Sequence, residues 1–425
     1  MSKIKTVLCG CGGRGSWLAR VAEKTEEFEI IGVCDFYLDK AESVAKLLKE
    51  QFNRDSKAYA DVSTMYDELK PEAVIIACSW EDHAKMACEA MNRGIKVGLE
   101  VGGAYSEQEC WDLVDTYERT KTPFMFLENC CYNVDEILAT SLHRNGRLGK
   151  IVYCSGAYGH DLRDEIAGGY VNRHYRLRNY IGRNCDNYPT HELGPIAKII
   201  DITRGNRFTS LISKSTGAYG LKEYVLEREE HKDLWDVEFK QADIVHTFIT
   251  CENGELIDIK LDTTLPRIAN RDLVVAGTKG RYEGNINSVQ IEGEFSHLTI
   301  DYKKQVDSAN NYREYLPEVW KNPSEQMLKA GHGGMDYLQM VEWAKAMKNG
   351  DEMPIDVYDA VSWMCITYLS EKSLKEGGVN VEIPDFTRGK YKSRPRKDVL
   401  EMPNIGSVEK EKVNVVDGSL TGNYQ

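Results

Sequence analysis

Short apolar runs alternate with amphipathic stretches through the first third of the chain. Continuous apolar runs predict strands at 4–9, 29–34, 73–78, 97–101 and 124–128. The stretches between several of these runs repeat apolar residues at helical spacing and predict helices at 40–50, 82–93 and 106–119. Strands that alternate with helices are typical of a parallel sheet covered on both faces. We therefore expect a doubly wound α/β domain over residues 1–129.

The pattern changes after residue 130. A helix at 133–145 and a strand at 150–158 are expected to precede a long, irregular polar stretch at 159–187 and a helix that begins at Thr190. Alternating runs predict further strands at 207–214, 243–251, 254–263, 271–276 and 286–292, and helices at 335–348 and 356–376. This pattern favours an α+β domain over residues 130–383, with a large open, mostly antiparallel sheet.

Three segments outside these elements are expected to lie at the surface. The highly charged stretch 222–240 is interpreted as a loop or a small insertion. Residues 302–325 carry several aromatic residues without a clear period, which favours a surface loop, with a lid as the alternative. The C-terminal tail, 384–425, has a basic cluster at 388–397 and is expected to be solvated and wrapped on the surface.

A glycine-rich turn follows the first predicted strand. It reads Gly10-Cys-Gly12-Gly13-Arg14-Gly15. Gly10 permits the tight turn, Gly12 lets the backbone approach a pyrophosphate, and Gly15 lets the next helix pack close to the strand. The N-terminus of that helix favours negative phosphate charge. This arrangement predicts a Rossmann-type domain.

An acidic residue ends the second predicted strand. Asp35 lies 20 residues after Gly15, where a carboxylate can accept hydrogen bonds from ribose hydroxyls. The same carboxylate repels a 2′-phosphate, so NAD is expected rather than NADP. The neighbouring Arg14 is a positive charge that would soften this preference.

Residues that follow three later strands are expected to meet at one edge of the sheet, because ligands bind at the carboxyl ends of parallel strands. They are Ser79, Trp80, His83, Glu100, Val101, Glu128 and Asn129. We expect them around the nicotinamide end of the cofactor. Trp80 is expected to cover the nicotinamide face, with a buried core tryptophan as the alternative.

Composition excludes several function classes. The chain has 54 basic and 67 acidic residues, a net charge of −13, which argues against nucleic acid or an anionic membrane as partner. No apolar stretch approaches the ~18 residues that span a bilayer, and the N-terminal segment lacks the pattern of a signal peptide, so a cytoplasmic protein is expected. The twelve cysteines include no C-x-x-C pair and are expected to be free thiols.

Several segments make the chain similar to the glucose–fructose oxidoreductase, inositol dehydrogenase and rhizopine catabolism (Gfo/Idh/MocA) family. They include Ser79-Trp-Glu-Asp-His83, Glu128-Asn-Cys-Cys-Tyr132, Tyr158-Gly-His-Asp-Leu-Arg163, Tyr188-Pro-Thr-His-Glu-Leu-Gly-Pro195 and Gly331-His-Gly-Gly-Met-Asp336. The resemblance is closer to one branch, the family 109 glycoside hydrolases, whose founding activity is an NAD-dependent α-N-acetylgalactosaminidase. It implies an NAD enzyme that acts on a small glycoside, and we expect a homo-oligomer.

Two positions distinguish this chain within that resemblance. Simple dehydrogenases of the wider family carry Glu-Lys-Pro, whereas this chain has Glu100-Val101-Gly102 and lacks the lysine, as the glycosidase branch does. The branch tends to have a substrate-contacting tyrosine just after a Pro-Arg pair, and here Ile268-Ala269-Asn270 stand instead. The second difference leaves the identity of the sugar open.

The resemblance implies an unusual route to glycoside cleavage. NAD oxidises the C3 hydroxyl of the sugar to a ketone, a base removes the acidified C2 proton, and the anomeric substituent leaves by elimination. Water then adds and the hydride returns. The alternative is an NAD-dependent sugar or glycoside 3-dehydrogenase with net redox change. A non-catalytic NAD-binding sensor is disfavoured by the many titratable groups.

Two residues are the expected acid–base groups. Histidine is the side chain suited to proton transfer near neutral pH, so His191 is the first choice to take the hydroxyl proton; otherwise it is a histidine of a helix start. Tyr158 is the expected base at C2, unless it is a tyrosine of the core. Arg176 and Tyr188 are expected to bridge cofactor and sugar. The expected substrate contacts are Glu128, Tyr158, His160, Arg176, Tyr188, Pro189, Thr190 and His191.

Two further features have alternative interpretations. His332 lies in a glycine-rich loop that either approaches the site or forms a structural turn. Cys185, His191, His160 and Glu128 are residue types that bind metals, but their spacing matches no known pattern, so no metal is predicted.

Overall fold

A six-stranded parallel sheet, sheet A, forms the first part of the molecule. The structure, a computed structural model, describes residues 2–294 and 302–405. The strand order is β3-β2-β1-β4-β5-β6 and every pairing is parallel. The strands are β1 (Ile4–Cys9), β2 (Phe28–Cys34), β3 (Lys57–Tyr59), β4 (Ala73–Ile76), β5 (Lys96–Glu100) and β6 (Phe124–Leu127). Their continuous apolar sequences are explained by burial on both faces.

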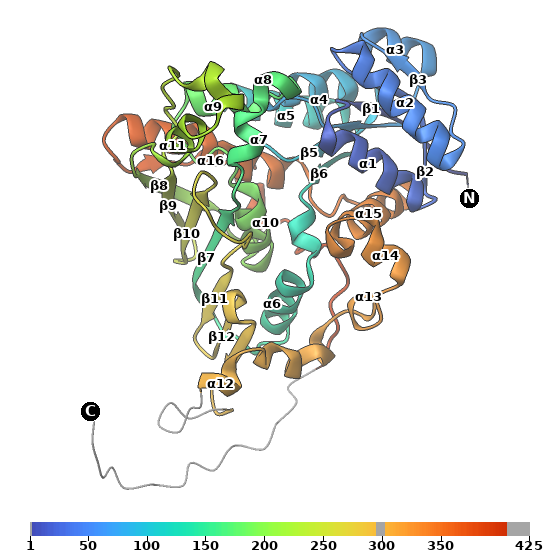
Figure 1. The fold of residues 1–425 in the computed structure, drawn as a ribbon. Coiled ribbons are helices and arrows are strands. Elements are labelled where there is room, and N and C mark those ends of the chain that lie inside the picture. The colour runs from blue at the N-terminus through green and yellow to red at the C-terminus, as the bar shows by residue number, and fades with distance from the viewer. Residues whose placement is uncertain (1, 295–301, 406–425) are drawn as a thin grey trace, which may run out of the picture.

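Helices connect the strands of sheet A, as the alternating pattern predicts (Figure 1). They are α1 (Gly13–Lys24), α2 (Leu38–Phe52), α3 (Val62–Leu69), η1 (Trp80–Asp82), α4 (His83–Asn92) and α5 (Glu107–Thr120). The doubly wound sheet is confirmed. Two elements were missed, β3 and α3, because a three-residue edge strand and an eight-residue helix are too short to establish a period.

An eight-stranded sheet, sheet B, forms the second part of the molecule. Its order is β13-β12-β11-β7-β10-β9-β8-β14, and β7 and β10 are its parallel pair among otherwise antiparallel neighbours. The strands are β7 (Ile151–Gly159), β8 (Phe208–Ser215), β9 (Ile244–Cys251), β10 (Leu256–Asp262), β11 (Val274–Gly277), β12 (Gly280–Glu283), β13 (Ser288–Ile291) and β14 (Val381–Glu382). The large, mostly antiparallel sheet is confirmed, and the short strands β12 and β14 were missed.

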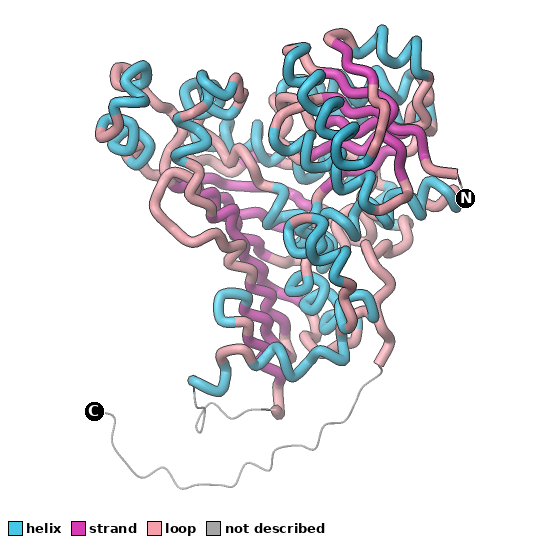
Figure 2. The backbone as a smooth tube through the Cα atoms, turned by 45° about the vertical axis from the view of Figure 1, so that its right-hand side comes forward, coloured by secondary structure: helices cyan, strands magenta, loops and turns pink. Residues whose placement is uncertain are grey.

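Helices pack along one side of sheet B (Figure 2). The longer helices of this part are α6 (Val134–Arg144), α10 (Thr190–Ile199), α15 (Met335–Asn349) and α16 (Val357–Lys375). Helix α10 contacts β7, and α16 contacts β8 and β6. Helix α15 lies far along the chain but returns to contact α1, which brings the two parts of the molecule together (Figure 1).

The polar stretch 159–187 is helical, so the expectation of an irregular segment was wrong. It contains α7 (Arg163–Ala167), α8 (Gly169–Asn172) and α9 (Arg176–Gly182). The charged stretch beside it contains α11 (Gly220–Leu226) and η3 (Glu229–Leu234). These short elements share a small core of their own: Leu162, Ile166, Ala167, Leu177, Tyr180, Leu221, Val225, Leu234 and Phe239. Burial in this core stabilises helices that are too short to be stable alone.

Residues 302–325 support the body of the molecule rather than forming a surface loop or a lid. They form the short elements α12 (Tyr302–Gln305), η5 (Ser308–Tyr315) and α13 (Glu318–Lys321), followed by α14 (Glu325–Ala330). Tyr315 and Trp320 are buried, and the Trp320 indole donates a hydrogen bond to the Tyr132 carbonyl at 3.0 Å. Aromatic burial, not periodicity, fixes this segment.

The tail is wrapped on the body up to residue 405, as expected, but it is partly buried rather than solvated. Phe386 and Val399 are buried. The basic cluster pairs with acidic residues of the body: Arg388 with Asp115 and Glu118, Lys390 with Glu118, Arg394 with Glu352 and Asp356, and Arg396 with Asp201. The rest of the expected tail, 406–425, lies outside the described residues.

Two further expectations concern the whole chain. All twelve cysteines are free thiols, as expected. Across the part of the chain that the structure describes, every helix is too short or too polar to cross a membrane.

A buried carboxyl group lies just before the Tyr188–Pro195 segment. Asp186 is fully buried and has no ion-pair partner among the described residues, and burial raises its pKa from 3.8 to about 7. Because the folded protein therefore binds more protons than the unfolded chain in this range, stability falls as pH rises from about 3.8 to about 7.

Asp186→Asn is expected to abolish this loss of stability. Above about pH 7 the variant should unfold with a free energy about 1–3 kcal/mol higher than that of the parent protein, the typical cost of an unpaired buried polar group. Denaturant unfolding across the pH range measures it, with the exposed Asp233→Asn as control. Parallel pH profiles of parent and variant would contradict the interpretation.

Candidate active site

A cavity of about 1040 Å³ lies where the carboxyl ends of the sheet A strands face β7, α9 and α10. Its walls come from both parts of the molecule. From the first part come the glycine turn, Asp35 and the segments after β4, β5 and β6. From the second come Tyr158, Arg176, Tyr188 and His191. Long-range folding therefore brings together residues that were chosen from separate motifs.

The glycine turn leaves room for a bound group at the start of α1. A side chain at Gly15 would place its Cβ 1.8 Å from the Gly10 carbonyl oxygen, whereas a Cβ at Gly12 or Gly13 would meet nothing within 4 Å. Helix α1 begins at Gly13 with no side-chain cap and no acidic residue in its first turn. Its free N–H groups and positive end can therefore accept a pyrophosphate.

Asp35 lies at the end of β2 and is fixed by the backbone around it. Its carboxylate accepts hydrogen bonds from the Cys11 N–H at 2.7 Å and the Tyr37 N–H at 2.9 Å. The group lines the cavity, as a ribose-binding carboxylate must.

Arg14 does not face the ribose position, contrary to the role that would soften the preference for NAD. Its guanidinium pairs with Glu100 at 3.2 Å and with Asp336 at 3.0 Å. Two carboxylates therefore hold its charge away from Asp35. One oxygen of Glu100, Oε2, is buried without a hydrogen-bond partner among the described residues. This orphaned acceptor beside the cavity, together with the open glycine cradle and Asp35, fits NAD.

An aromatic cluster forms the wall at the expected nicotinamide end. The ring of Trp80 lies 4.9 Å from that of Tyr175 and 5.4 Å from that of Tyr188, measured between centroids. The guanidinium of Arg176 lies over both Trp80 and Tyr188, at 5.3 and 5.4 Å from the ring centroids. Trp80 is buried and also lines the cavity, so its contact with the nicotinamide stays a prediction.

Three other expected cofactor contacts lie close by. Ser79 donates a hydrogen bond to Asp82 at 2.6 Å. The His83 ring nitrogen Nε2 lies 3.2 Å from the Cys78 carbonyl, and burial lowers the pKa of His83 to about 4, so the ring is neutral. Asn129 donates to Asp336 at 2.9 Å. All three residues line the cavity, so they shape its wall as well as contacting neighbours.

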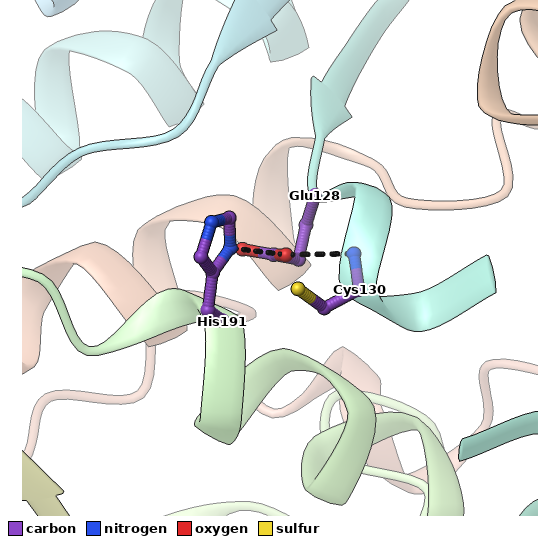
Figure 3. A group of neighbouring side chains, drawn as sticks. All are labelled: Glu128, Cys130 and His191. Carbon is purple, nitrogen blue, oxygen red and sulfur yellow. Dashed lines mark hydrogen bonds and ion pairs between the residues drawn. The ribbon is translucent and has the colours of Figure 1, made fainter. Parts of the chain in front are cut away.

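His191 lies in the first turn of α10, and a buried carboxylate holds its ring (Figure 3). Its Nδ1 lies 2.7 Å from Oε1 of Glu128, which also accepts the Cys130 N–H at 3.0 Å. Burial alone would raise the pKa of Glu128, but His191 and the hydrogen bonds outweigh it, and the net pKa lies below the usual value. With Nδ1 donating to a carboxylate, Nε2 is the nitrogen that can exchange protons with a ligand.

Tyr158 lies on β7 beside His191 and Tyr188. Its ring centroid is 5.4 Å from that of His191 and 4.5 Å from that of Tyr188. Burial raises the pKa of Tyr158 to about 12, and the nearby Arg176 guanidinium opposes that shift. A positive charge next to the phenol is what stabilises a phenolate.

Not every expected substrate contact reaches the cavity. Glu128, Pro189 and Thr190 are buried and do not line it, because they lie behind His191 and Tyr188 in the wall. They support the site rather than touch its contents. His160 is exposed in the cavity, with its ring 6.3 Å from that of Tyr158.

Several cavity residues were missed by sequence reasoning. They include Phe36, Tyr37, Lys40, Cys130, Glu165, Arg173, Tyr175, Arg271 and Met335. His332 also lines the cavity, so of its two alternatives the approach to the site is the one observed. Arg173 pairs with Asp39 across the groove, and Arg178 pairs with Glu81. Cys130 and Met335 lie in segments that carry the family resemblance, which was a signal for them. Tyr175 and Arg173 belong to a stretch that is dense in aromatic and basic residues, which was a second signal.

One cluster has the residue types of a metal site. Glu128, Cys130 and His191 each place one possible ligand atom within 4.8 Å of the others (Figure 3). However, Glu128 is already engaged by His191 and the Cys130 N–H, and burial raises the pKa of the Cys130 thiol well above its usual value. Because the thiolate is the metal ligand, the donor set favours a hydrogen-bonded His–Glu pair. Cys185 and His160, the other candidates, are not in this cluster.

The fold and the cavity define a Gfo/Idh/MocA-type enzyme. Residues 4–127 match the family model described as "Oxidoreductase family, NAD-binding Rossmann fold", so the cofactor is NAD as expected. Residues 132–393 match the model described as "Glycosyl hydrolase 109, C-terminal domain". The chain belongs to glycosyl hydrolase family 109.

Similar proteins span nearly the whole chain. A glycosyl hydrolase family 109 protein of Stenotrophomonas maltophilia is 35% identical over 420 residues, 92% of this chain and 91% of that protein. An alpha-N-acetylgalactosaminidase of Tannerella forsythia is 34% identical over 387 residues, 85% of this chain and 82% of that protein. The solved WlbA dehydrogenase of Bordetella pertussis, in complex with NADH and UDP-GlcNAcA, has a TM-score of 0.63 at 14% identity and covers 90% of this chain and 98% of its own. At that identity it shows the fold alone.

Proposed function

We propose that this protein is an NAD-dependent glycoside hydrolase that works through transient oxidation of the sugar at C3. One observation carries the proposal. A histidine oriented by a buried carboxylate, His191 with Glu128, lies beside Tyr158 in the cavity wall where the expected nicotinamide end meets sheet B. Membership of glycosyl hydrolase family 109 supports the hydrolytic outcome. We also propose residues 1–129 as the cofactor domain and 130–383 as the substrate domain.

His191 is proposed to remove the proton of the C3 hydroxyl. NAD, when bound, supplies the hydride acceptor and later the hydride donor. Glu128 keeps the imidazole oriented through Nδ1, so that Nε2 faces the reacting hydroxyl and the positive charge that develops on the ring is stabilised. When the hydride returns, the same nitrogen gives the proton back.

Tyr158 is proposed to remove the C2 proton. The C3 ketone acidifies the neighbouring C–H bond, and the electron pair freed at C2 forms a C1–C2 double bond as the anomeric substituent leaves. Arg176 lies next to Tyr158 and favours the phenolate. Water then adds at C1, a proton returns to C2, and reduction of the ketone completes hydrolysis with no net redox change.

The alternative function is that of a glycoside 3-dehydrogenase, which would release oxidised sugar. Val101, buried at the end of β5, occupies the place of the lysine that simple dehydrogenases of the wider family use for proton transfer. This substitution, with the family membership, favours hydrolysis. The sugar itself is proposed only as a small glycoside, because Ala269 and Asn270 line the cavity where the expected tyrosine is missing.

Turnover in D₂O tests the proposal. If elimination proceeds through a ketone, the C2 hydrogen leaves as a proton, so released sugar should carry deuterium at C2, read by mass spectrometry. The reaction should need no added NAD and should release no stoichiometric NADH. Hydrolysis without C2 exchange would refute the oxidation–elimination route. Stoichiometric NADH without glycoside cleavage would instead establish the dehydrogenase.

A further inference from the structure

A single buried carboxylate from the second half of the chain, that of Asp336, accepts hydrogen bonds from several residues around the expected cofactor site. Asp336, in the first turn of α15, is fully buried. Its oxygens accept hydrogen bonds from Arg14 at 3.1 and 3.0 Å, Trp17 at 2.9 Å and Asn129 at 2.9 Å, and from His332 at 2.6 Å. Five N–H groups on one carboxylate compensate for its burial.

The glycine loop before α15 is shaped to bring this carboxylate to the start of α1. Gly331 has φ +153°, and a Cβ there would lie 2.7 Å from both Oδ2 of Asp336 and Nε1 of Trp17. Gly334 has φ +109°, and a Cβ there would lie 2.8 Å from the Met327 side chain. Only glycine fits these positions, so the loop is built for close approach rather than for a generic turn.

His332 is the member of this group with an unbonded ring nitrogen among the described residues. Its Nδ1 is bound to Asp336, and its ring lies edge-on to Trp17 with centroids 6.2 Å apart. Its side chain is 53% exposed and lines the cavity together with Gly12, Gly13 and Arg14. Among the described residues none forms a hydrogen bond with Nε2. The ring that carries this free nitrogen is therefore part of the cavity wall and packs against Trp17 of α1.

The start of α1 is where the fold directs the diphosphate of a dinucleotide. Because Asp336 holds Nδ1, Nε2 is the ring nitrogen that is left to contact a ligand. Phosphate oxygens are charged and are therefore strong acceptors of a hydrogen bond from a ring N–H.

We propose that the loop 331–336 is part of the NAD site. His332 binds the cofactor's diphosphate through Nε2, and Asp336 is a positioning residue that fixes His332, Arg14 and Asn129 around it. The inference rests on NAD binding and not on the proposed hydrolysis, so binding measurements on NAD-free protein test it whatever the reaction proves to be.

Fragments of the cofactor provide the test. His332→Ala is expected to weaken binding of NAD and of ADP-ribose by about tenfold or more, the value of one hydrogen bond to a charged group. Binding of adenosine, which has no phosphate, should not change. Calorimetry with each compound measures the affinities. Cooperative thermal unfolding of the NAD-free variant should show that it remains folded, because Arg14, Trp17 and Asn129 still donate to Asp336.

A second histidine–aspartate pair supplies the matched control. His246 is 41% exposed and its Nδ1 lies 2.9 Å from Asp258, but it does not line the cavity. His246→Ala should leave all three affinities unchanged. Unchanged NAD affinity in His332→Ala would overturn the proposal, and so would an equal loss for adenosine, because that loss could not come from a diphosphate contact.

Asp336→Asn tests the positioning role. It should weaken NAD binding more than His332→Ala does, because it also releases Arg14 and Asn129. Adding His332→Ala to this variant should cost less than in the parent protein, since the two residues act as one unit. Full additivity in a folded double variant would refute the positioning role. If Asp336→Asn fails to fold, the exposed His332 and the fragment series still decide the diphosphate contact.

Discussion

Replacing His191 with alanine is expected to lower glycoside turnover by ~10²–10⁴-fold, the usual contribution of a positioned acid–base group. The imidazole is the group proposed to take the C3 hydroxyl proton, and its carboxylate partner Glu128 cannot replace it because Glu128 does not line the cavity. Steady-state rates on a panel of nitrophenyl glycosides measure the loss. NAD content should stay near that of the parent protein.

The stage at which the His191→Ala reaction stops is as informative as its rate. Without the base, hydride transfer fails, so substrate should produce neither the absorbance of reduced nicotinamide nor deuterium exchange at C2. His246→Ala, which changes a histidine outside the cavity, serves as control. An active His191→Ala enzyme would assign the hydroxyl proton to another group, with Tyr158 as the nearest candidate.

Tyr158→Phe is expected to lower turnover by a similar ~10²–10⁴-fold, but at a later step. The phenyl ring preserves the contacts with Tyr188 and His191, while the hydroxyl that is proposed to remove the C2 proton is lost. Oxidation should still proceed, so absorbance of reduced nicotinamide should build up on the enzyme after substrate is added. Exchange at C2 and release of the leaving group should both be slow.

The two variants therefore separate the two proton transfers. Tyr153→Phe is the matched control for Tyr158→Phe, because Tyr153 lies on the same strand but outside the cavity. A Tyr158→Phe enzyme that exchanges C2 at the parent rate would exclude the phenol as the base. A variant with neither reduced nicotinamide nor exchange would place Tyr158 in the oxidation step instead.

The sequence was sufficient for five of the six strands of sheet A, all but the three-residue β3, and for the residues at its carboxyl edge. Long apolar runs such as 73–78 have one structural interpretation, and the glycine turn with Asp35 constrains the local backbone. Trp80, Glu100 and Asn129 could be placed near one another because parallel strands end at a shared edge. His191 and Tyr158 required the family resemblance, since no periodicity connects residues from α10 and β7.

What could not be predicted depends on contacts between distant segments. Glu128 was expected to touch the sugar, and only the packing of α10 against the segment after β6 places it behind His191. Asp336 lies 322 residues from Arg14, and nothing local signals that pair. The burial of the tail could not be predicted for the same reason, because Phe386 is buried by residues distant in the sequence.

The loop after β10, residues 268–270, lines the cavity but contributes little to the hydrophobic core. Ile268 is 89% exposed, and Ala269 and Asn270 face the cavity without a place in the hydrophobic core. The proposed acid–base groups, by contrast, lie on β7 and α10, which the core holds in place. Exchanging side chains in such a loop costs little stability. New sugar preferences can therefore evolve, or be selected in a library of loop variants, on an unchanged catalytic scaffold.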